Sequence, residues 1–118
     1  MTITLYGIPN CDSVKKARAW LDARKISYTF HDYKKSGIDA GRLATWCEIL
    51  GWETVLNRKG TTFRKLPDAQ KSNLDRAKAI ELMLQQPSMI KRPLVEHPGG
   101  LLAGLTPEAW DAVFERRD

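Results

Sequence analysis

One cysteine, Cys11, lies where the sequence predicts that a strand gives way to a helix. Residues 2–6 are β-branched, apolar or aromatic, which favours a strand, and residues 7–10 are typical of a turn. From Asp12 onward apolar residues recur at helical spacing, so we expect Cys11 at a helix N-terminus. Unpaired backbone N–H groups and the helix dipole stabilise an anion there. The sequence therefore predicts a thiol with a lowered pKa, and the thiolate is the nucleophilic form.

The neighbours of Cys11 leave alternatives open. A free cysteine is often a small buried hydrophobe, and the carboxylate of Asp12 disfavours a thiolate. Lys15 and Lys16 offset that carboxylate if they lie near the sulfur. Asn10 is either a turn or capping residue or a polar contact to a substrate. Because a helix N-terminus also holds oxyanions, the chemistry that we expect is thiol redox chemistry or anion binding.

The second cysteine, Cys47, has a different setting. It falls among apolar residues at helical spacing, which predicts packing in the core rather than the role of a resolving thiol. Two cysteines make no disulfide framework, so we expect a reducing cytoplasm. His31 and His97 lack companion ligands at metal spacing, and we expect no metal site.

The composition is typical of one soluble domain. The chain has 118 residues, 42% of them hydrophobic and 28% charged, which is enough to bury a core. No apolar run approaches the roughly 20 residues that cross a bilayer, and we see no signal peptide. The formal net charge of +5 indicates either a solvated basic surface or attraction to an anionic partner. No nucleic-acid-binding motif occurs, so nucleic acid is not the expected partner.

The sequence beyond the first helix predicts a mixed set of elements. Residues 26–33 alternate like a strand, which gives a parallel strand–helix–strand unit. A helix is expected from Asp39 to Leu50. Residues 34–38 are expected to form a loop and residues 57–65 a loop or turn, and short helical pieces are expected after Pro67. A further helix is expected over about 75–86 with one aligned apolar face, formed by Ala77, Ile80 and Leu84.

The end of the chain predicts a hairpin followed by a helix. Residues 93–96 and 101–104 read as strands joined by a turn at 97–100, and Thr106 is placed to cap a last helix with a buried face of Trp110, Val113 and Phe114. Periodicity alone gives an α/β class with a mixed sheet. The order βαβ, helical insertion, ββα around one mixed four-stranded sheet is the thioredoxin-like arrangement.

Several motifs of the chain resemble one family. They are Leu5-Tyr6-Gly7-x-x-Asn10-Cys11-Asp12-x-x-Lys15-Lys16-Ala17, Phe30-His31-Asp32-Tyr33, Leu50-Gly51-Trp52-Glu53, Gly60-Thr61-Thr62-Phe63-Arg64-Lys65-Leu66 and Ile90-Lys91-Arg92-Pro93-Leu94. Together they resemble the arsenate reductase ArsC/Spx/YffB family, and the later ones resemble its YffB subgroup. The resemblance implies a single ArsC-like thioredoxin-fold domain over residues 1–118, with a helical insertion at about 37–87.

The resemblance also implies roles for individual residues. Cys11 is the implied nucleophile, and Arg92 is the implied oxyanion-binding residue, although by position alone Arg92 reads as a surface charge. Pro93 is the implied cis proline beside the active site. The middle-loop arginine of arsenate reductases has no in-register match, and the nearest candidates are Arg58 and Arg64, which by residue type alone read as solvated. The arginine after the terminal hairpin is absent, because this chain has Gly104-Leu105-Thr106-Pro107.

We therefore expect a cytoplasmic, glutathione-dependent thiol-disulfide oxidoreductase or ArsC-like reductase with a single nucleophilic cysteine. The resemblance makes glutathione the co-substrate, with no bound cofactor, and the substrate a small oxidised thiol or an oxyanion. The expected site residues are Cys11, Arg92, Asn10, Arg58, Arg64 and Lys15, with Pro93 in a structural role. Alternatives are an Spx-like transcriptional regulator that binds RNA polymerase as a protein partner, or an arsenate reductase with weak activity. The Spx-type Cys-x-x-Cys pair is missing, since Val14 occupies its second position.

Overall fold

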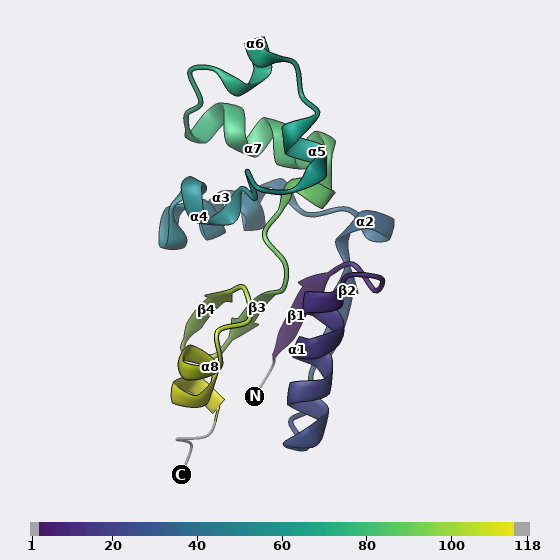
Figure 1. Cartoon of the computed structure of the whole chain (residues 1–118). Coiled ribbons are helices and arrows are strands. Elements are labelled where there is room, and N and C mark those ends of the chain that lie inside the picture. The colour runs from purple at the N-terminus through teal and green to yellow at the C-terminus, as the bar shows by residue number, and fades with distance from the viewer. Residues whose placement is uncertain (1–2, 115–118) are drawn as a thin grey trace. The chain divides into compact units, whose positions relative to one another are not determined.

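The computed structural model describes residues 3–114 and divides into two units. The first unit joins the chain up to Asp32 with the chain from Arg92 onward, and the second is Tyr33–Lys91. Both are shown in Figure 1. The insertion expected at about 37–87 lies within the second unit. That the whole chain acts as a single domain stays a prediction.

The first unit contains a mixed four-stranded sheet, as predicted. Its strands are β1 (Thr4–Gly7), β2 (Thr29–Asp32), β3 (Leu94–His97) and β4 (Gly100–Ala103), in the order β2-β1-β3-β4. Strand β1 pairs parallel with β2, and the other two pairs are antiparallel. Thr2, where the first strand was expected to begin, lies outside the described residues. Strand β2 is shorter than the expected 26–33, because pairing with β1 begins at Thr29 and Tyr33 already belongs to a helix.

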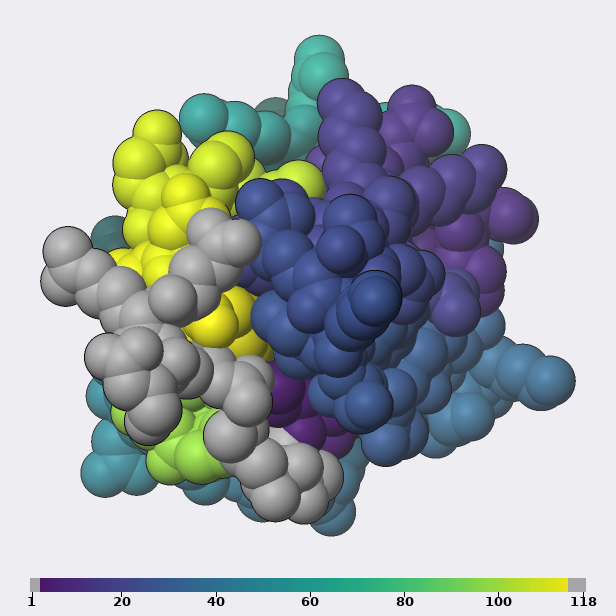
Figure 2. Space-filling view, turned by 90° about the horizontal axis from the view of Figure 1, so that it is seen from below, coloured from purple at the N-terminus to yellow at the C-terminus, as the bar shows by residue number. Residues whose placement is uncertain are grey.

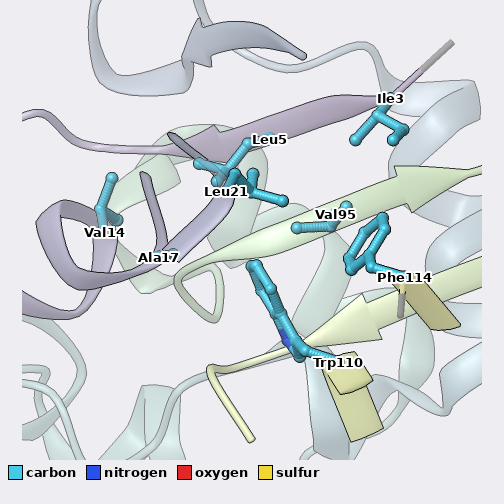
Figure 3. Close-up of a cluster of buried hydrophobic side chains, with 8 residues drawn as sticks. All are labelled: Ile3, Leu5, Val14, Ala17, Leu21, Val95, Trp110 and Phe114. Carbon is cyan, nitrogen blue, oxygen red and sulfur yellow. The ribbon is translucent and has the colours of Figure 1, made fainter. Parts of the chain in front are cut away.

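Helices α1 (Asp12–Ala23) and α8 (Pro107–Phe114) cover one face of this sheet. Their buried side chains pack against the strand residues of that face, as Figure 3 shows. The cluster consists of Ile3, Leu5, Val14, Ala17, Leu21, Val95, Trp110 and Phe114. The predicted face of the first helix is confirmed, and so are Trp110 and Phe114; Val113 is only partly buried.

The two helices also contact each other directly. The Trp20 ring meets the Trp110 ring edge-on, with 5.3 Å between centroids, and lies 5.8 Å from the Phe114 ring. Figure 2 shows the blue surface of α1 next to the yellow surface of α8. The aromatic contacts fix how the C-terminal helix lies on α1, and they add to the area that both helices bury.

The second unit is helical. It contains α2 (Tyr33–Ser36), α3 (Ala40–Leu50), α4 (Trp52–Val55), α5 (Thr61–Arg64), α6 (Asp68–Lys71), α7 (Arg76–Gln85) and the 3₁₀ turn η1 (Pro87–Met89). The two loops expected at 34–38 and 57–65 are wrong in part, because each contains a one-turn helix. Such single turns leave no periodic pattern long enough to be read from a sequence.

The buried face of α7 also differs from the prediction. Its buried residues are Ala79, Leu82 and Met83, whereas Ala77 is exposed and Leu84 is 38% exposed. The helix has apolar residues on more than one side, so periodicity alone did not select the face that packs. The start of α3 is as predicted, since the side chain of Asp39 accepts a hydrogen bond from the N–H of Arg42 at 2.8 Å.

The two ends of the second unit lie close together. The buried hydroxyl of Tyr33 donates a hydrogen bond to the carbonyl oxygen of Ile90 at 2.8 Å, and α2 packs against η1. Leu56 and Ile90 form an isolated bridge, and the N–H of Lys91 donates to the oxygen of Val55. In the part of the chain that the structure describes, no helix is both long enough and apolar enough to cross a membrane.

Candidate functional site around Cys11

Cys11 is the N-cap residue of α1, as the sequence predicts. A turn after β1 leads into the helix, and the Cys11 N–H donates to the oxygen of Ile8 at 3.1 Å. The Cys11 carbonyl accepts the first helical hydrogen bond, from the N–H of Lys15 at 2.9 Å. Its side chain makes no capping hydrogen bond and is partly exposed. The thiol thus occupies the position of a capping oxygen at the positive end of a twelve-residue helix.

The surroundings of this thiol favour its ionised form. Burial acts against ionisation and is the largest single influence, but it is outweighed by the N–H of Val14, the Arg92 guanidinium and the N–H of Ser13, so the pKa of Cys11 lies below its ordinary value. Arg92 acts both by a hydrogen bond to the sulfur and by its charge. The predicted direction of the shift is confirmed. A thiolate beside a guanidinium is the form that attacks disulfides.

Gly7, the last residue of β1, lets the helix begin close to the sheet. A Cβ added to Gly7 would lie 2.6 Å from Cγ2 of Val14, which is a forbidden contact. Val14 is fully buried, and its N–H is one of the groups that stabilise the thiolate. Because Gly7 has no side chain, the first turn of α1 can take this position, and no sequence pattern signals that role.

Arg92 and Pro93 enter the hairpin of the same unit. The peptide bond between them is cis. The oxygen of Pro93 accepts a hydrogen bond from the N–H of Gly104 at 2.7 Å, and the oxygen of Gly104 accepts one from the indole N–H of Trp110 at 3.1 Å. Gly104 has φ +77°, a conformation that favours glycine. The segment next to Arg92 is thus held by Gly104, which follows β4, and through Gly104 by Trp110 of α8.

The other expected site residues have different positions. Asn10 is exposed in the turn before Cys11, and Lys15 is exposed in the first turn of α1. Arg58 and Arg64 are exposed residues of the second unit. The guanidinium of Arg58 lies 5.7 Å from the centroid of the Trp52 ring. Roles in anion binding for these four residues stay predictions.

Cys47 is buried in α3, which confirms its predicted packing. Burial raises the pKa of its thiol, although the charge of Arg76 acts in the opposite direction. Neither cysteine forms a disulfide. Within residues 3–114, no group of three or more His, Cys, Asp or Glu side chains is arranged to hold a metal ion.

The sheet order and the helix that begins at Cys11 define a thioredoxin-like fold. The model of the ArsC family matches residues 6–113, so the chain belongs to the ArsC family. The solved structure of a protein named YffB is 62% identical, with a TM-score of 0.91 over 94% of this chain and 97% of that one. The solution structure of an arsenate reductase (ArsC) related protein from Brucella melitensis is 55% identical, with a TM-score of 0.77 over 98% and 96% of the two chains.

A regulator is also among the relatives. The global transcriptional regulator Spx of Streptococcus pyogenes serotype M3 is 28% identical over 116 residues, which cover 97% of this chain and 86% of the regulator. The family thus includes proteins named as reductases and proteins named as regulators. Choosing between these activities depends on the chemistry at Cys11.

Proposed function

We propose that this protein is a thiol-dependent reductase that removes glutathione from mixed disulfides, with Cys11 as its single nucleophile. The observation that carries the proposal is the lowered pKa of a partly exposed thiol at the start of α1, stabilised by two backbone N–H groups and Arg92. The proposal places the reaction in the cytoplasm, where glutathione keeps thiols reduced.

The reaction would proceed in two balanced exchanges. The Cys11 thiolate attacks the glutathione sulfur of a mixed disulfide, the substrate leaves as a thiolate, and a Cys11–glutathione disulfide forms. The thiolate of a second glutathione then attacks that bond, which restores the Cys11 thiolate and releases oxidised glutathione. The second thiol must come from outside the chain, because Cys47 is buried and its pKa is raised.

Arg92 has two roles in this proposal. It holds Cys11 as a thiolate before the attack, and its guanidinium stabilises the negative charge that returns to the sulfur when the second exchange is complete. The proposal adds Asn10 and Lys15 as polar contacts for a carboxylate of glutathione, because both are exposed close to Cys11 in the sequence. Arg58 and Arg64 are proposed as further anion contacts on the family resemblance alone.

Mass spectrometry after incubation with oxidised glutathione tests this proposal. We expect one glutathionyl group on the wild type and on Cys47→Ala, none on Cys11→Ser, and its removal by reduced glutathione. A hydroxyl is a far poorer nucleophile than a thiolate at neutral pH, so Cys11→Ser is also expected to have no turnover. Modification at Cys47, or a Cys11–Cys47 disulfide, would contradict the single-thiol mechanism.

A second candidate is a regulator of the Spx type that binds RNA polymerase. The distribution of charge favours some partner for the second unit: residues 33–91 contain 11 of the 19 lysines and arginines but only 6 of the 14 acidic residues. The whole formal excess of positive charge therefore lies in the helical unit, whereas the unit with Cys11 is formally neutral. Retention of polymerase binding by Cys11→Ser, together with no glutathionylation of the wild type, would favour the regulator.

A further inference from the structure

A surface groove lies between the end of α1 and the beginning of β2, entirely within the first unit. Its volume is about 600 Å³, and its walls include Arg18, Lys25, Ser27, Tyr28 and Phe30. Two aromatic rings, two hydroxyls and two cations thus meet in one open depression, together with the carboxylate of Asp22. None of these residues belongs to the Cys11 site.

Arg18 is fixed at this groove by its neighbours. Its Nε–H donates a hydrogen bond to the hydroxyl of Tyr28 at 3.1 Å, and its guanidinium lies 4.4 Å from the centroid of the Phe30 ring. These contacts hold the guanidinium plane, so little side-chain entropy remains to be lost when an anion binds. Asp22, one helical turn further on, lines the same groove. Among the ion pairs of the described residues, none joins Asp22 to Arg18.

The Arg18 guanidinium therefore has further N–H groups that can bind a ligand. An arginine has five N–H groups in a fork that matches a carboxylate, and Tyr28 accepts only the one on Nε. The remaining N–H groups of a half-buried cation favour a carboxylate as the occupant. Lys25 at the same groove adds to the positive charge.

The groove adjoins one edge of the sheet. Strand β2 is the outermost strand in the order β2-β1-β3-β4. The Thr29 N–H is bonded to the oxygen of Ile3 on β1 at 2.8 Å. Because backbone groups alternate in direction along a strand, the N–H and C=O of Phe30 point away from β1. Phe30 thus offers a ring to the groove and an amide that does not pair with β1 to the edge.

We propose that the groove and the adjoining edge of β2 together bind an extended, acidic segment of a partner protein. The segment pairs with the edge of β2 through its backbone, as in β-strand addition. A glutamate or aspartate on the α1 side of the segment then lies against the Arg18 fork, since directly opposed residues on paired strands are about 5 Å apart.

A second copy of this chain fits the groove and the edge of β2 less well. Its β2 would bring a second Arg18 and a second Lys25 to the same place, where like charges repel. Asp32, the one acidic residue of β2, already takes part in an interaction within the chain. A foreign acidic strand has neither disadvantage.

Binding of a short capped peptide of alternating valine and glutamate tests the proposal on the full chain. In ¹⁵N-resolved NMR spectra we expect shifts of the Phe30 amide and of the Arg18 Nε–H signal, and no such shifts with the matched valine–lysine peptide. Arg18→Gln should weaken binding at least about tenfold, because a charge-assisted hydrogen bond is lost. Arg24→Gln is the matched control, since Arg24 stacks on Trp20 at 3.7 Å instead of lining the groove.

Three results would overturn the proposal. One is the absence of these shifts at millimolar peptide while the spectrum shows a folded protein. The second is an equal response to acetate or sulfate alone, which identifies a site for small anions rather than for a peptide. The third is a concentration-dependent dimer that broadens the Phe30 amide signal without peptide, which assigns the edge to a second copy.

Discussion

The side chain of Val14 occupies the space that a side chain on Gly7 would need. A Cβ on Gly7 would lie 2.6 Å from one methyl carbon of Val14 and 3.3 Å from the other. Val14 is fully buried, so it cannot turn away into solvent. The end of β1 and the first turn of α1 are thereby fixed against each other, at positions three and four residues from Cys11 in the sequence.

Gly7→Ala is expected to destabilise the protein by about 1–3 kcal/mol, because the added methyl overpacks this contact. Urea unfolding measures the change. Val14→Ala removes both crowding methyls, so Gly7→Ala should cost clearly less in that background. Gly99→Ala is the control, since its added Cβ would meet His97 at an ordinary 3.5 Å. The steric explanation would be refuted if Gly7→Ala lowered the free energy of unfolding equally in the wild type and in the Val14→Ala background.

Arg92→Ala should raise the pKa of Cys11. The guanidinium stabilises the thiolate by a hydrogen bond and by its charge, while burial continues to oppose ionisation when it is removed. The rate of alkylation by iodoacetamide, followed from pH 5 to 10, should therefore rise at a higher pH in the variant than in the wild type. Arg24→Ala, on the same unit but stacked on Trp20, should leave the profile unchanged. A profile of Arg92→Ala that superimposes on the wild type would remove Arg92 from the site.

Sulfate binding measures the contribution of Arg92 to anion affinity. Loss of a charge-assisted hydrogen bond costs roughly 1.5–3 kcal/mol, or about 10- to 150-fold in affinity. Calorimetry should show this weakening for Arg92→Ala and a smaller one for Arg92→Lys, which keeps the charge but not the fork. Unchanged sulfate affinity in both variants would mean that the anion binds elsewhere.

The two cysteines should affect stability in opposite directions as pH changes. The pKa of Cys11 is lowered on folding, so its stabilising effect is full above the unfolded pKa of about 8.5 and is lost as pH falls through the lower folded value. The pKa of Cys47 is raised, so its effect is present below about pH 8.5 and is lost as pH rises through the higher folded value. Urea unfolding between pH 6 and 10 checks both signs. Relative to the wild type, Cys11→Ser should lose stability as pH rises toward 8.5, and Cys47→Ala should gain it above 8.5.

Gly104→Ala should destabilise the hairpin unit by about 1–2 kcal/mol. Gly104 has φ +77°, where an L-residue with a Cβ is strained. Its N–H and C=O also connect Pro93 to Trp110, so the strain is expected to disturb the segment next to Arg92. Thermal unfolding measures the stability, and the iodoacetamide profile of Cys11 measures the site. If both are unchanged, the Gly104 link has no role in holding this segment.

Much of the first unit could be predicted from the sequence, because its signals are local. The turn before Cys11, the apolar spacing of Val14, Ala17 and Leu21, and the Pro98-Gly99 turn each depend on adjacent residues. The mixed sheet then follows from the order of the elements. The contact between Gly7 and Val14 and the Pro93–Gly104–Trp110 hydrogen bonds depend on tertiary packing, and no sequence period signals them.

The second unit was harder to predict for a related reason. Two of its one-turn helices, α2 and α5, are shorter than any helical period that a pattern can establish. In α7 the residues that pack were decided by contacts with α3 and η1 rather than by the strongest apolar stripe. Arg18 was likewise missed, since its significance comes from Tyr28 and Phe30 on a different element.

The hydrogen bond from Tyr33 to Ile90 has a consequence for how the chain folds. Strands β1 and β3 pair, with Tyr6 opposite Leu94, although the whole helical unit separates them in the sequence. Closing a disordered loop of that length has an entropic cost that grows with the logarithm of its length. Once the helical unit has folded, the contact between Tyr33 and Ile90 holds its two ends side by side. The polypeptide between β2 and β3 then behaves as a short connection, so the helical unit can fold first and serve as the closure for the sheet.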